Sequence, residues 1–199
     1  MNLNIIICGV GGQGNLLASV AIANYMMKKG YNVVGTETIG AAQRGGSVVS
    51  HLRVSDGQVY SPIIPDGTAD VLLGFEPVEA LRHIEKLSPD GFYIINVEKM
   101  PTVLCNLGLD YYPDLNQIRE VLGKVSPRGY AINATDKARQ LGGVIMTNVV
   151  LLGALSKVSD YFDREEFIEV LKSIISPKVL KNNLEAFEVG RAMIVSQST

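Results

Sequence analysis

Short apolar runs recur between residues 3 and 133, and turns or segments of helical periodicity separate them. Leu3–Cys8 is apolar at nearly every position, which is typical of a strand that is buried on both faces of a parallel sheet. Similar runs follow at regular intervals along the chain. The pattern predicts strands at residues 3–8, 31–36, 47–54, 70–75, 92–97 and 129–133.

Amphipathic segments lie between these strands and fill the last third of the chain. The first, Asn15–Lys29, ends on two lysines that suit the helix dipole, and Gly30 is a common helix stop. Near the end of the chain, Asp163 and Glu166 have the spacing of a capping box. The pattern predicts helices at residues 15–29, 76–87, 115–124, 135–141, 148–158, 163–174 and 178–195.

The alternation of strands and helices is interrupted after residue 54. Asp56-Gly57 is a strong hairpin signal, so residues 58–61 should return antiparallel to the strand at 47–54. Residues 98–113 have no clear period and should form a loop with at most a short strand. We therefore expect a Rossmann-like, doubly wound α/β fold, with a mostly parallel sheet, a β-hairpin insertion and a helical C-terminal third. One domain, residues 1–199, is the simplest arrangement.

Composition narrows the possible functions. The formal net charge of −2 provides no basic face for nucleic acid. No run approaches the roughly 20 apolar residues that a membrane span needs. The two cysteines, Cys8 and Cys105, are too few for an iron–sulfur cluster, which takes about four thiolates, and His51 and His83 show no zinc-ligand spacing with them. We expect no metal site and a cytoplasmic protein.

A glycine-rich loop follows the first strand and opens the first helix. Residues 9–14 read Gly-Val-Gly-Gly-Gln-Gly, which has the Gly-x-Gly-x-x-Gly spacing of dinucleotide-binding loops. Free N–H groups at such a helix start favour an anion. Glu37 follows the second strand, where a ribose-binding carboxylate would lie. An NAD-dependent dehydrogenase is therefore one interpretation, although Gly-Gly-Gln-Gly is unusual in such a loop.

A second glycine loop, Gln43-Arg44-Gly45-Gly46, follows the second strand. In a doubly wound fold, both loops reach the carboxyl edge of neighbouring strands, where Arg44 could present two N–H donors to a phosphate or carboxylate. Alternatively, Arg44 is a surface residue and the two glycines are a plain turn. We assign the candidate anion site to Gly9, Gly11, Gly12, Gln13, Gly14, Gln43, Arg44, Gly45 and Gly46.

The remaining polar residues suggest no catalytic centre, and we assign no catalytic residue. His51 could be a catalytic base, but a strand histidine is more often simply hydrogen-bonded. Ser47 and Ser50 lack the surroundings of a hydrolase nucleophile. His83 should be solvated on a polar helix face. Tyr111-Tyr112-Pro113 is a candidate partner contact, or packs beneath its own loop.

Together, the two glycine loops resemble a known family. Gly-Val-Gly-Gly-Gln-Gly at residues 9–14, with Gly-Ala-Ala-Gln-Arg-Gly-Gly-Ser at residues 40–47, is similar to the gamma subunit, or domain, of 2-oxoacid:ferredoxin oxidoreductases. Within the family, the chain looks most like the beta subunit of indolepyruvate:ferredoxin oxidoreductases. The resemblance covers nearly the whole chain, including Gly153 and Gly190 in the helical third.

The resemblance implies an assembly that oxidatively decarboxylates a 2-oxoacid, forms an acyl-CoA and reduces ferredoxin. Thiamine diphosphate and 4Fe-4S clusters would lie on a larger partner subunit. The present chain lacks the Gly-Asp-Gly…Asn-Asn signature of a thiamine diphosphate site, because Asn182-Asn183 has no such sequence upstream. It would be a non-catalytic subunit whose glycine loops face the partner or contact coenzyme A. A homodimer of the isolated chain and a free-standing nucleotide-binding module stay open.

Overall fold

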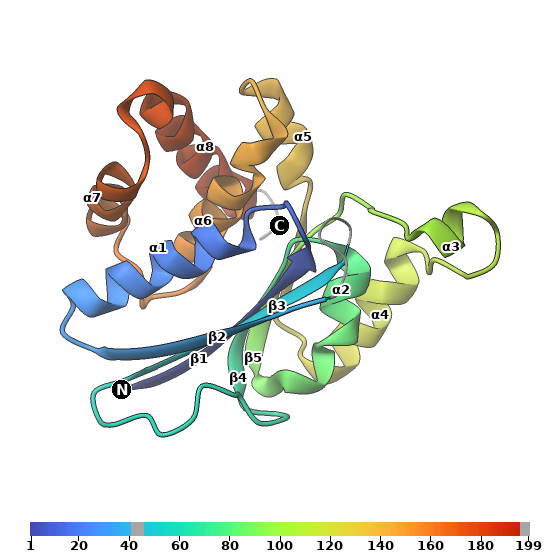
Figure 1. The fold of residues 1–199 in the computed structure, drawn as a ribbon, viewed down its shortest axis with the longest axis horizontal. Helices are drawn as coiled ribbons and strands as arrows, with labels where there is room; N and C mark the ends of the chain where they lie inside the picture. The colour runs from blue at the N-terminus through green and yellow to red at the C-terminus, as the bar shows by residue number, and fades with distance from the viewer. Residues whose placement is uncertain (41–45, 196–199) are drawn as a thin grey trace.

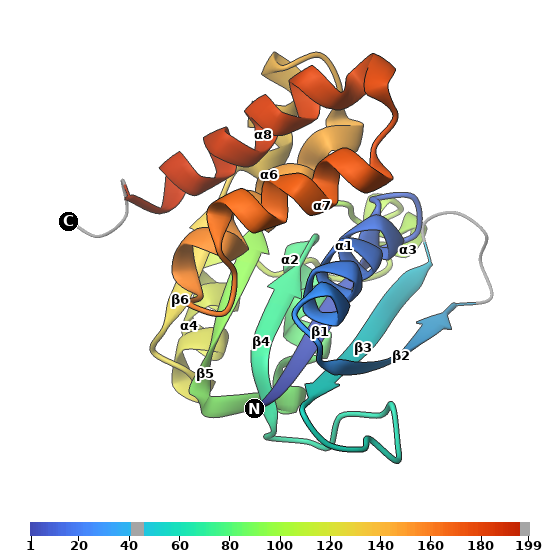
Figure 2. The ribbon, with the colours of Figure 1, turned by 90° about the vertical axis from the view of Figure 1, so that its left-hand side faces the viewer.

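The computed structural model describes residues 1–40 and 46–195. A six-stranded sheet crosses the molecule, and helices pack on both of its faces (Figure 1, Figure 2). The order across the sheet is β2-β3-β1-β4-β5-β6, and among these strands β3 alone runs in the opposite direction to the rest. The predicted mostly parallel α/β sheet is therefore confirmed. The strands are β1 (Asn2–Val10), β2 (Asn32–Ile39), β3 (Ser47–Ser55), β4 (Ala69–Gly74), β5 (Leu87–Asn96) and β6 (Gly129–Ile132).

The helices divide into two layers. Those of the C-terminal third gather with the first helix on one face of the sheet, and two helices from the middle of the chain cover the other face (Figure 1). The first layer holds α1 (Asn15–Lys28), α5 (Ala134–Gln140), α6 (Thr147–Val158), α7 (Arg164–Ile174) and α8 (Pro177–Val195). The second holds α2 (Pro77–Arg82) and α4 (Leu115–Val125); the short α3 (Val103–Asn106) projects from the sheet edge.

Each layer encloses its own apolar core. Ile5 and Ile7 of β1 belong to the core beneath α1 and α6, whereas Ile6 and Cys8 belong to the core beneath α2 and α4. Successive residues of a strand point to opposite faces, so an all-apolar strand can serve both cores at once. This is the reason that residues 3–8 are apolar without interruption.

The antiparallel hairpin lies elsewhere than the sequence pattern suggests. It consists of β2 and β3, and residues 58–61 form no strand, so that prediction is wrong. β3 already has β1 on one side and β2 on the other, which leaves no open edge for a returning strand. Side chains of β3 bond to the backbone of the loop that follows it instead. Arg53 Nη1 donates to the Ser61 carbonyl at 2.9 Å, and His51 Nδ1 accepts from the Ile64 N–H at 3.2 Å.

The other elements follow the predicted pattern with local differences. Residues 76–87 divide into α2 and a 3-10 turn at Ile84–Lys86, and residues 98–113 contain α3 and no strand. Asp163 caps α7 by accepting from the Glu165 and Glu166 N–H groups. The second half of the expected capping box is not formed, because the Glu166 carboxylate pairs with Lys29 and accepts from Tyr25 Oη at 3.1 Å.

Two glycines allow α6 and α8 to approach closely. A Cβ at Gly153 would lie 2.0 Å from the Phe187 carbonyl oxygen, and a Cβ at Gly190 would lie 1.9 Å from the Val150 carbonyl oxygen. Both obstacles are backbone atoms, which cannot rotate away as a side chain can. Any larger residue therefore forces the two helices apart and disturbs the core that they share with the sheet.

We predict that Gly153→Ala lowers the free energy of unfolding by about 1–3 kcal/mol, because overpacking separates α6 from α8. Urea denaturation monitored by circular dichroism measures this change. Gly123→Ala on α4 is the matched control, since a Cβ there meets no described atom within 4 Å. This control should leave stability unchanged or raise it by up to ~1 kcal/mol, because alanine favours helix. Equal effects of the two substitutions would contradict the close-approach explanation.

Candidate functional site

The glycine loop lies at the carboxyl edge of the sheet, between the end of β1 and the start of α1. After β1 the chain builds β2 and β3 on one side, and then returns to build β4 on the other side. Such a change of direction opens a crevice at the ends of the strands, where ligands of open α/β sheets bind. The position of the loop is therefore that of a binding site in this class of fold (Figure 1).

The glycines of the loop meet different steric demands. Gly9 faces β4, because a Cβ there would lie 2.7 Å from Phe75 Cβ. Gly12 and Gly14 have φ angles of 100° and 88°, in the left-handed region that favours glycine. A Cβ at Gly14 would lie 2.4 Å from Asn148 Nδ2, but a Cβ at Gly12 would meet no described atom within 4 Å. Gly12 is therefore the point of the loop that a ligand or another chain can approach.

The Gln13 side chain is bound within the chain itself. Its Oε1 accepts from the Val10 N–H at 2.7 Å, and its Nε2 donates to the Phe75 carbonyl at 3.2 Å. The same Nε2 lies 3.2 Å from Met100 Sδ. Gln13 thus ties the glycine loop to the end of β4 and to the irregular segment at residues 98–113, which follows β5. A direct contact between Gln13 and an anion would require these hydrogen bonds to open.

The two glycine loops meet, but not because their strands are neighbours. The expectation of neighbouring strands is wrong, since β3 lies between β1 and β2. β3 begins where both other strands end, with Ser47 opposite Val10. The Gly11 N–H consequently donates to the Gly46 carbonyl at 2.9 Å. Gln43, Arg44 and Gly45 lie outside the described residues, so their role in the site stays a prediction.

α1 begins without a side-chain cap. Its N-cap is Gly14, no side-chain hydrogen bond among the described residues caps the N–H groups of its first turn, and that turn contains no acidic residue. The N–H groups and the positive end of the helix dipole are thus left for another acceptor. The Asn15 side chain is 5% exposed, and neither of its polar atoms has a hydrogen-bond partner among the described residues. Such groups cost on the order of 1–3 kcal/mol, so this helix start is not optimised for stability.

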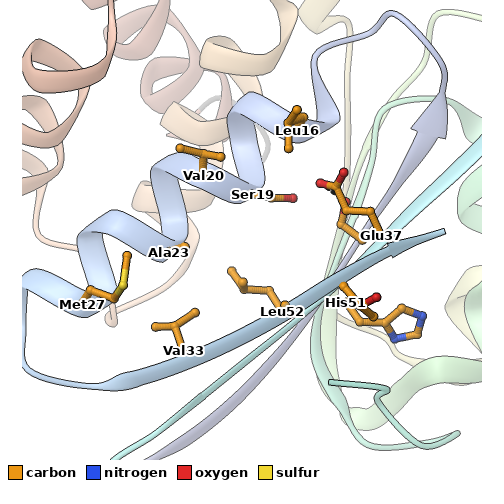
Figure 3. Close-up of a pocket in the computed structure, with 12 residues that line it drawn as sticks. Leu16, Ser19, Val20, Ala23, Met27, Val33, Glu37, His51 and Leu52 are labelled. Atoms are coloured by element: carbon orange, nitrogen blue, oxygen red, sulfur yellow. Dashed lines mark hydrogen bonds between the residues drawn. The ribbon is translucent and has the colours of Figure 1, made fainter. Parts of the chain in front are cut away.

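An apolar groove of about 330 Å³ extends from the helix start along α1 (Figure 3). One wall is α1 and the other is the β2–β3 hairpin. The Glu37 carboxylate points into the groove toward α1, and its Oε1 accepts from Ser50 Oγ at 3.2 Å. The groove is otherwise lined largely by aliphatic side chains, among them Leu16, Val20, Met27, Val33 and Leu52.

Glu37 does not lie where a ribose-binding carboxylate would lie. In the sheet, Glu37 is opposite Ser50, and Ser50 is opposite Ile7, so β3 separates Glu37 from β1. Ile7 precedes Val10 by three residues, which places Glu37 roughly 10 Å below the end of β1 at about 3.3 Å per residue. The geometry therefore does not favour the NAD interpretation.

Glu76 organises the sheet edge beside the glycine loop. Its side chain is 2% exposed, and its Oε2 caps α2 by accepting from the Val78 and Glu79 N–H groups at 2.7 and 2.9 Å. Its Oε1 accepts from the Met100 N–H at 3.2 Å and from the Tyr112 hydroxyl. Burial and this hydrogen bond raise the pKa of Tyr112. Glu76 thus joins α2 to both ends of the irregular segment.

The histidines have structural surroundings. His51 is 6% exposed, its ring points away from the groove, and burial lowers its pKa, with Lys86 and His83 contributing. Its hydrogen bond to Ile64 supports the interpretation of a simply hydrogen-bonded strand histidine. The prediction that His83 is solvated is wrong: Nε2 is buried without a hydrogen-bond partner among the described residues, and burial lowers the pKa of this histidine as well.

Comparison with known proteins identifies the family. Residues 4–193 match the model of the pyruvate ferredoxin/flavodoxin oxidoreductase family. The chain belongs to this family. Indolepyruvate oxidoreductase subunit IorB of Archaeoglobus fulgidus is 41% identical over 197 residues, which cover 98% of this chain and 97% of that protein. The resemblance that the glycine loops suggested is confirmed.

Solved structures share the fold of this family member. The keto/oxoacid ferredoxin oxidoreductase gamma subunit from Geobacter sulfurreducens PCA has a TM-score of 0.71 at 22% identity, with 98% of this chain and 99% of that chain covered. A 2-oxoglutarate:ferredoxin oxidoreductase from Magnetococcus marinus has a TM-score of 0.77 at 24% identity. There, 99% of this chain matches only 32% of that chain, so the same fold forms part of a longer polypeptide.

Two residues that position the site in this family member were not recognised in the sequence. The sequence did indicate a role for Glu76, because an acidic residue before a proline is typical of a helix start. Asn96 gave no such signal. It is fully buried at the end of β5, donates to the Phe75 carbonyl and to Thr135 Oγ1, and accepts from the Ala134 and Thr135 N–H groups.

Neither a metal centre nor a membrane span emerges from the described part of the chain. In residues 1–40 and 46–195, no group of three or more His, Cys, Asp or Glu side chains could hold a metal ion. Within the same residues, every helix is too short or too polar to cross a membrane.

We predict that the free energy of unfolding decreases as the pH falls below about 6.5, the usual pKa of histidine in an unfolded chain. The folded state holds His51 and His83 at lowered pKa values, so the unfolded state binds protons first. Urea titrations at several pH values from neutral to mildly acidic measure the slope. His51→Asn, which keeps an acceptor for the Ile64 N–H, should reduce the slope, and His83→Asn should reduce it further. An unchanged slope in both variants would refute this assignment.

Proposed function

We propose that this chain is the non-catalytic subunit of a 2-oxoacid:ferredoxin oxidoreductase that acts on an aryl pyruvate such as indolepyruvate. The observation that carries this proposal is the 41% identity, over nearly the full length of both chains, to an indolepyruvate oxidoreductase subunit. The assembly oxidatively decarboxylates the 2-oxoacid to an acyl-CoA and reduces ferredoxin. The isolated chain is inactive in this proposal.

The polar side chains at the sheet edge support a non-catalytic role. Glu76 accepts four hydrogen bonds, and the Gln13 amide is bound to β1 and β4. Neither is free to transfer a proton or to attack a substrate. Thiamine diphosphate and 4Fe-4S clusters belong to the larger partner subunit in this proposal, and ferredoxin meets this chain only indirectly. This chain contributes shape and backbone donors to a shared site.

Contact with coenzyme A is the finer part of the proposal. The uncapped start of α1 and the accessible backbone at Gly12 suit a phosphate group, which coenzyme A carries. The Gly11–Gly46 hydrogen bond brings Gly46, the last residue of the second loop, to the same place. Arg44, from the adjoining segment, would supply the positive charge. When bound, coenzyme A provides the thiol that accepts the acyl group; this chain only holds its anionic end.

The subunit role predicts a larger companion in cells. Affinity purification of the tagged chain from its native host should recover a larger chain that binds thiamine diphosphate and iron–sulfur clusters. The complex, but not this chain alone, should reduce ferredoxin with coenzyme A and a 2-oxoacid. Comparing indolepyruvate, pyruvate and 2-oxoglutarate in this assay tests the substrate. A native protein that runs alone in size-exclusion chromatography would refute the subunit role.

The coenzyme A contact is tested by calorimetry on the complex. Arg44→Ala should weaken coenzyme A binding roughly tenfold or more, since a hydrogen bond to a charged group contributes about 1.5–3 kcal/mol. Arg164→Ala is the control, because Arg164 pairs with Glu188 on the surface of α7 and α8. This control should bind coenzyme A as the native complex does. Equal binding by the Arg44→Ala complex would end this part of the proposal.

A further inference from the structure

Residues 98–113 form an arm that leaves the carboxyl edge of the sheet. α3 lies at its tip, away from the rest of the molecule (Figure 1). Apolar side chains on this arm are exposed to water, from 43% at Met100 to 73% at Leu109. Contiguous exposed apolar residues are unusual on a monomer and mark contact surfaces. The exposed set is Met100, Leu104, Leu107, Leu109 and Tyr111.

The arm is held firmly at both ends. Glu76 accepts from the Met100 N–H and from the Tyr112 hydroxyl, which join the start and the end of the arm to one buried carboxylate. Tyr111 Oη donates to Gln117 Oε1 on α4 at 2.6 Å, although the Tyr111 ring is exposed. The arm is therefore a protrusion whose base is held by hydrogen bonds and whose apolar tip is exposed.

The chemistry of the tip favours a protein as its partner. No lysine or arginine occurs between residues 100 and 118, whereas Asp110 and Asp114 lie in this stretch. Anionic lipid surfaces and nucleic acids both attract clusters of basic residues. An apolar, weakly acidic tip lacks this attraction. Burial against apolar protein surface is the remaining source of binding energy.

A larger chain suits the arm better than a second copy does. A stable interface buries about 800 Å² per partner and takes roughly 20–30 residues from each side. Two arms that met tip to tip would share far fewer. A recess in a larger chain, by contrast, encloses a protrusion on several sides. In the Magnetococcus marinus protein, this fold accounts for 32% of its chain, so further polypeptide accompanies the fold there.

We infer that the arm inserts Leu104, Leu107 and Leu109 into an apolar recess of the larger, thiamine diphosphate-binding chain. This inference rests on the proposed function and adds the surface by which the two chains join. The arm starts beside the glycine loop, because Met100 Sδ lies 3.2 Å from Gln13 Nε2. Docking of the arm therefore brings the glycine loops to the partner as well.

The thiol of Cys105 can serve as a chemical probe of this surface. Cys105 lies on α3, within the arm and only partly buried, whereas Cys8 is fully buried. The chain has two cysteines, so N-ethylmaleimide should modify Cys105 alone in the folded protein. In the native complex, modification of Cys105 should be at least about tenfold slower than in the free chain, because the partner covers the thiol. Mass spectrometry of the modified peptide measures both rates.

Substitutions give the second test. Leu107→Asp and Leu109→Asp should each weaken association with the larger chain by about tenfold or more, since a charge would be buried in an apolar recess. Both side chains are exposed in the free chain, so circular dichroism should show an unchanged fold. Ile63→Asp is the matched control, because Ile63 is exposed on the loop between β3 and β4, at the opposite edge of the sheet. It should leave association unchanged.

The outcomes separate this inference from the proposed function. If the native preparation contains no larger chain, the subunit role fails and the inference fails with it. If the larger chain is present but Cys105 reacts as fast as in the free chain, or if Leu107→Asp and Ile63→Asp behave alike, the inference alone is overturned. A cross-link from Cys105 to a second copy of this chain would also overturn it.

Discussion

The pairing of β3 with both β1 and β2 is the interaction on which the rest of the site depends. Because β3 runs antiparallel to its neighbours, it begins where they end, and its first residues lie beside the glycine loop. The Gly11–Gly46 hydrogen bond follows from this register. The same pairing occupies both edges of β3, which turns residues 56–68 into a loop that side chains must hold in place.

Some polar groups at the sheet edge are hydrogen-bonded within the chain, and others have no partner among the described residues. Glu76, Asn96 and Gln13 bond to backbone from several elements and fix the ends of the strands. The start of α1 differs, since it lacks a cap and leaves the Asn15 side chain without a partner among the described residues. The strand ends are thus held in place, while the N–H groups of the neighbouring helix start lack an acceptor in the described part of the chain. This combination suits one wall of a shared site, in which a ligand or another chain supplies the missing hydrogen bonds.

Local patterns predicted most elements correctly for a physical reason. Whether a segment forms a strand or a helix depends on apolar periodicity and caps, which lie within the segment itself. The prediction of a strand at residues 58–61 was wrong because β1 and β2 already occupy both edges of β3, and a strong turn signal does not change that. The prediction of a solvated His83 was wrong because its Nε2 is buried, which the polar sequence around it does not indicate. Of the two aromatic residues at 111–112, Tyr112 is half-buried and donates to Glu76, whereas Tyr111 is exposed.

The sequence by itself determined most of the strand and helix segments, the glycine positions and the family, because the patterns that indicate them lie within short stretches of consecutive residues. Only the tertiary structure decided which strands are neighbours, and therefore that the glycine loops meet across the start of β3. It also decided that the Gln13 amide donates to the Phe75 carbonyl and that Glu76 holds both ends of the apolar arm. These features depend on hydrogen bonds between residues far apart in the chain, and no local pattern specifies such partners.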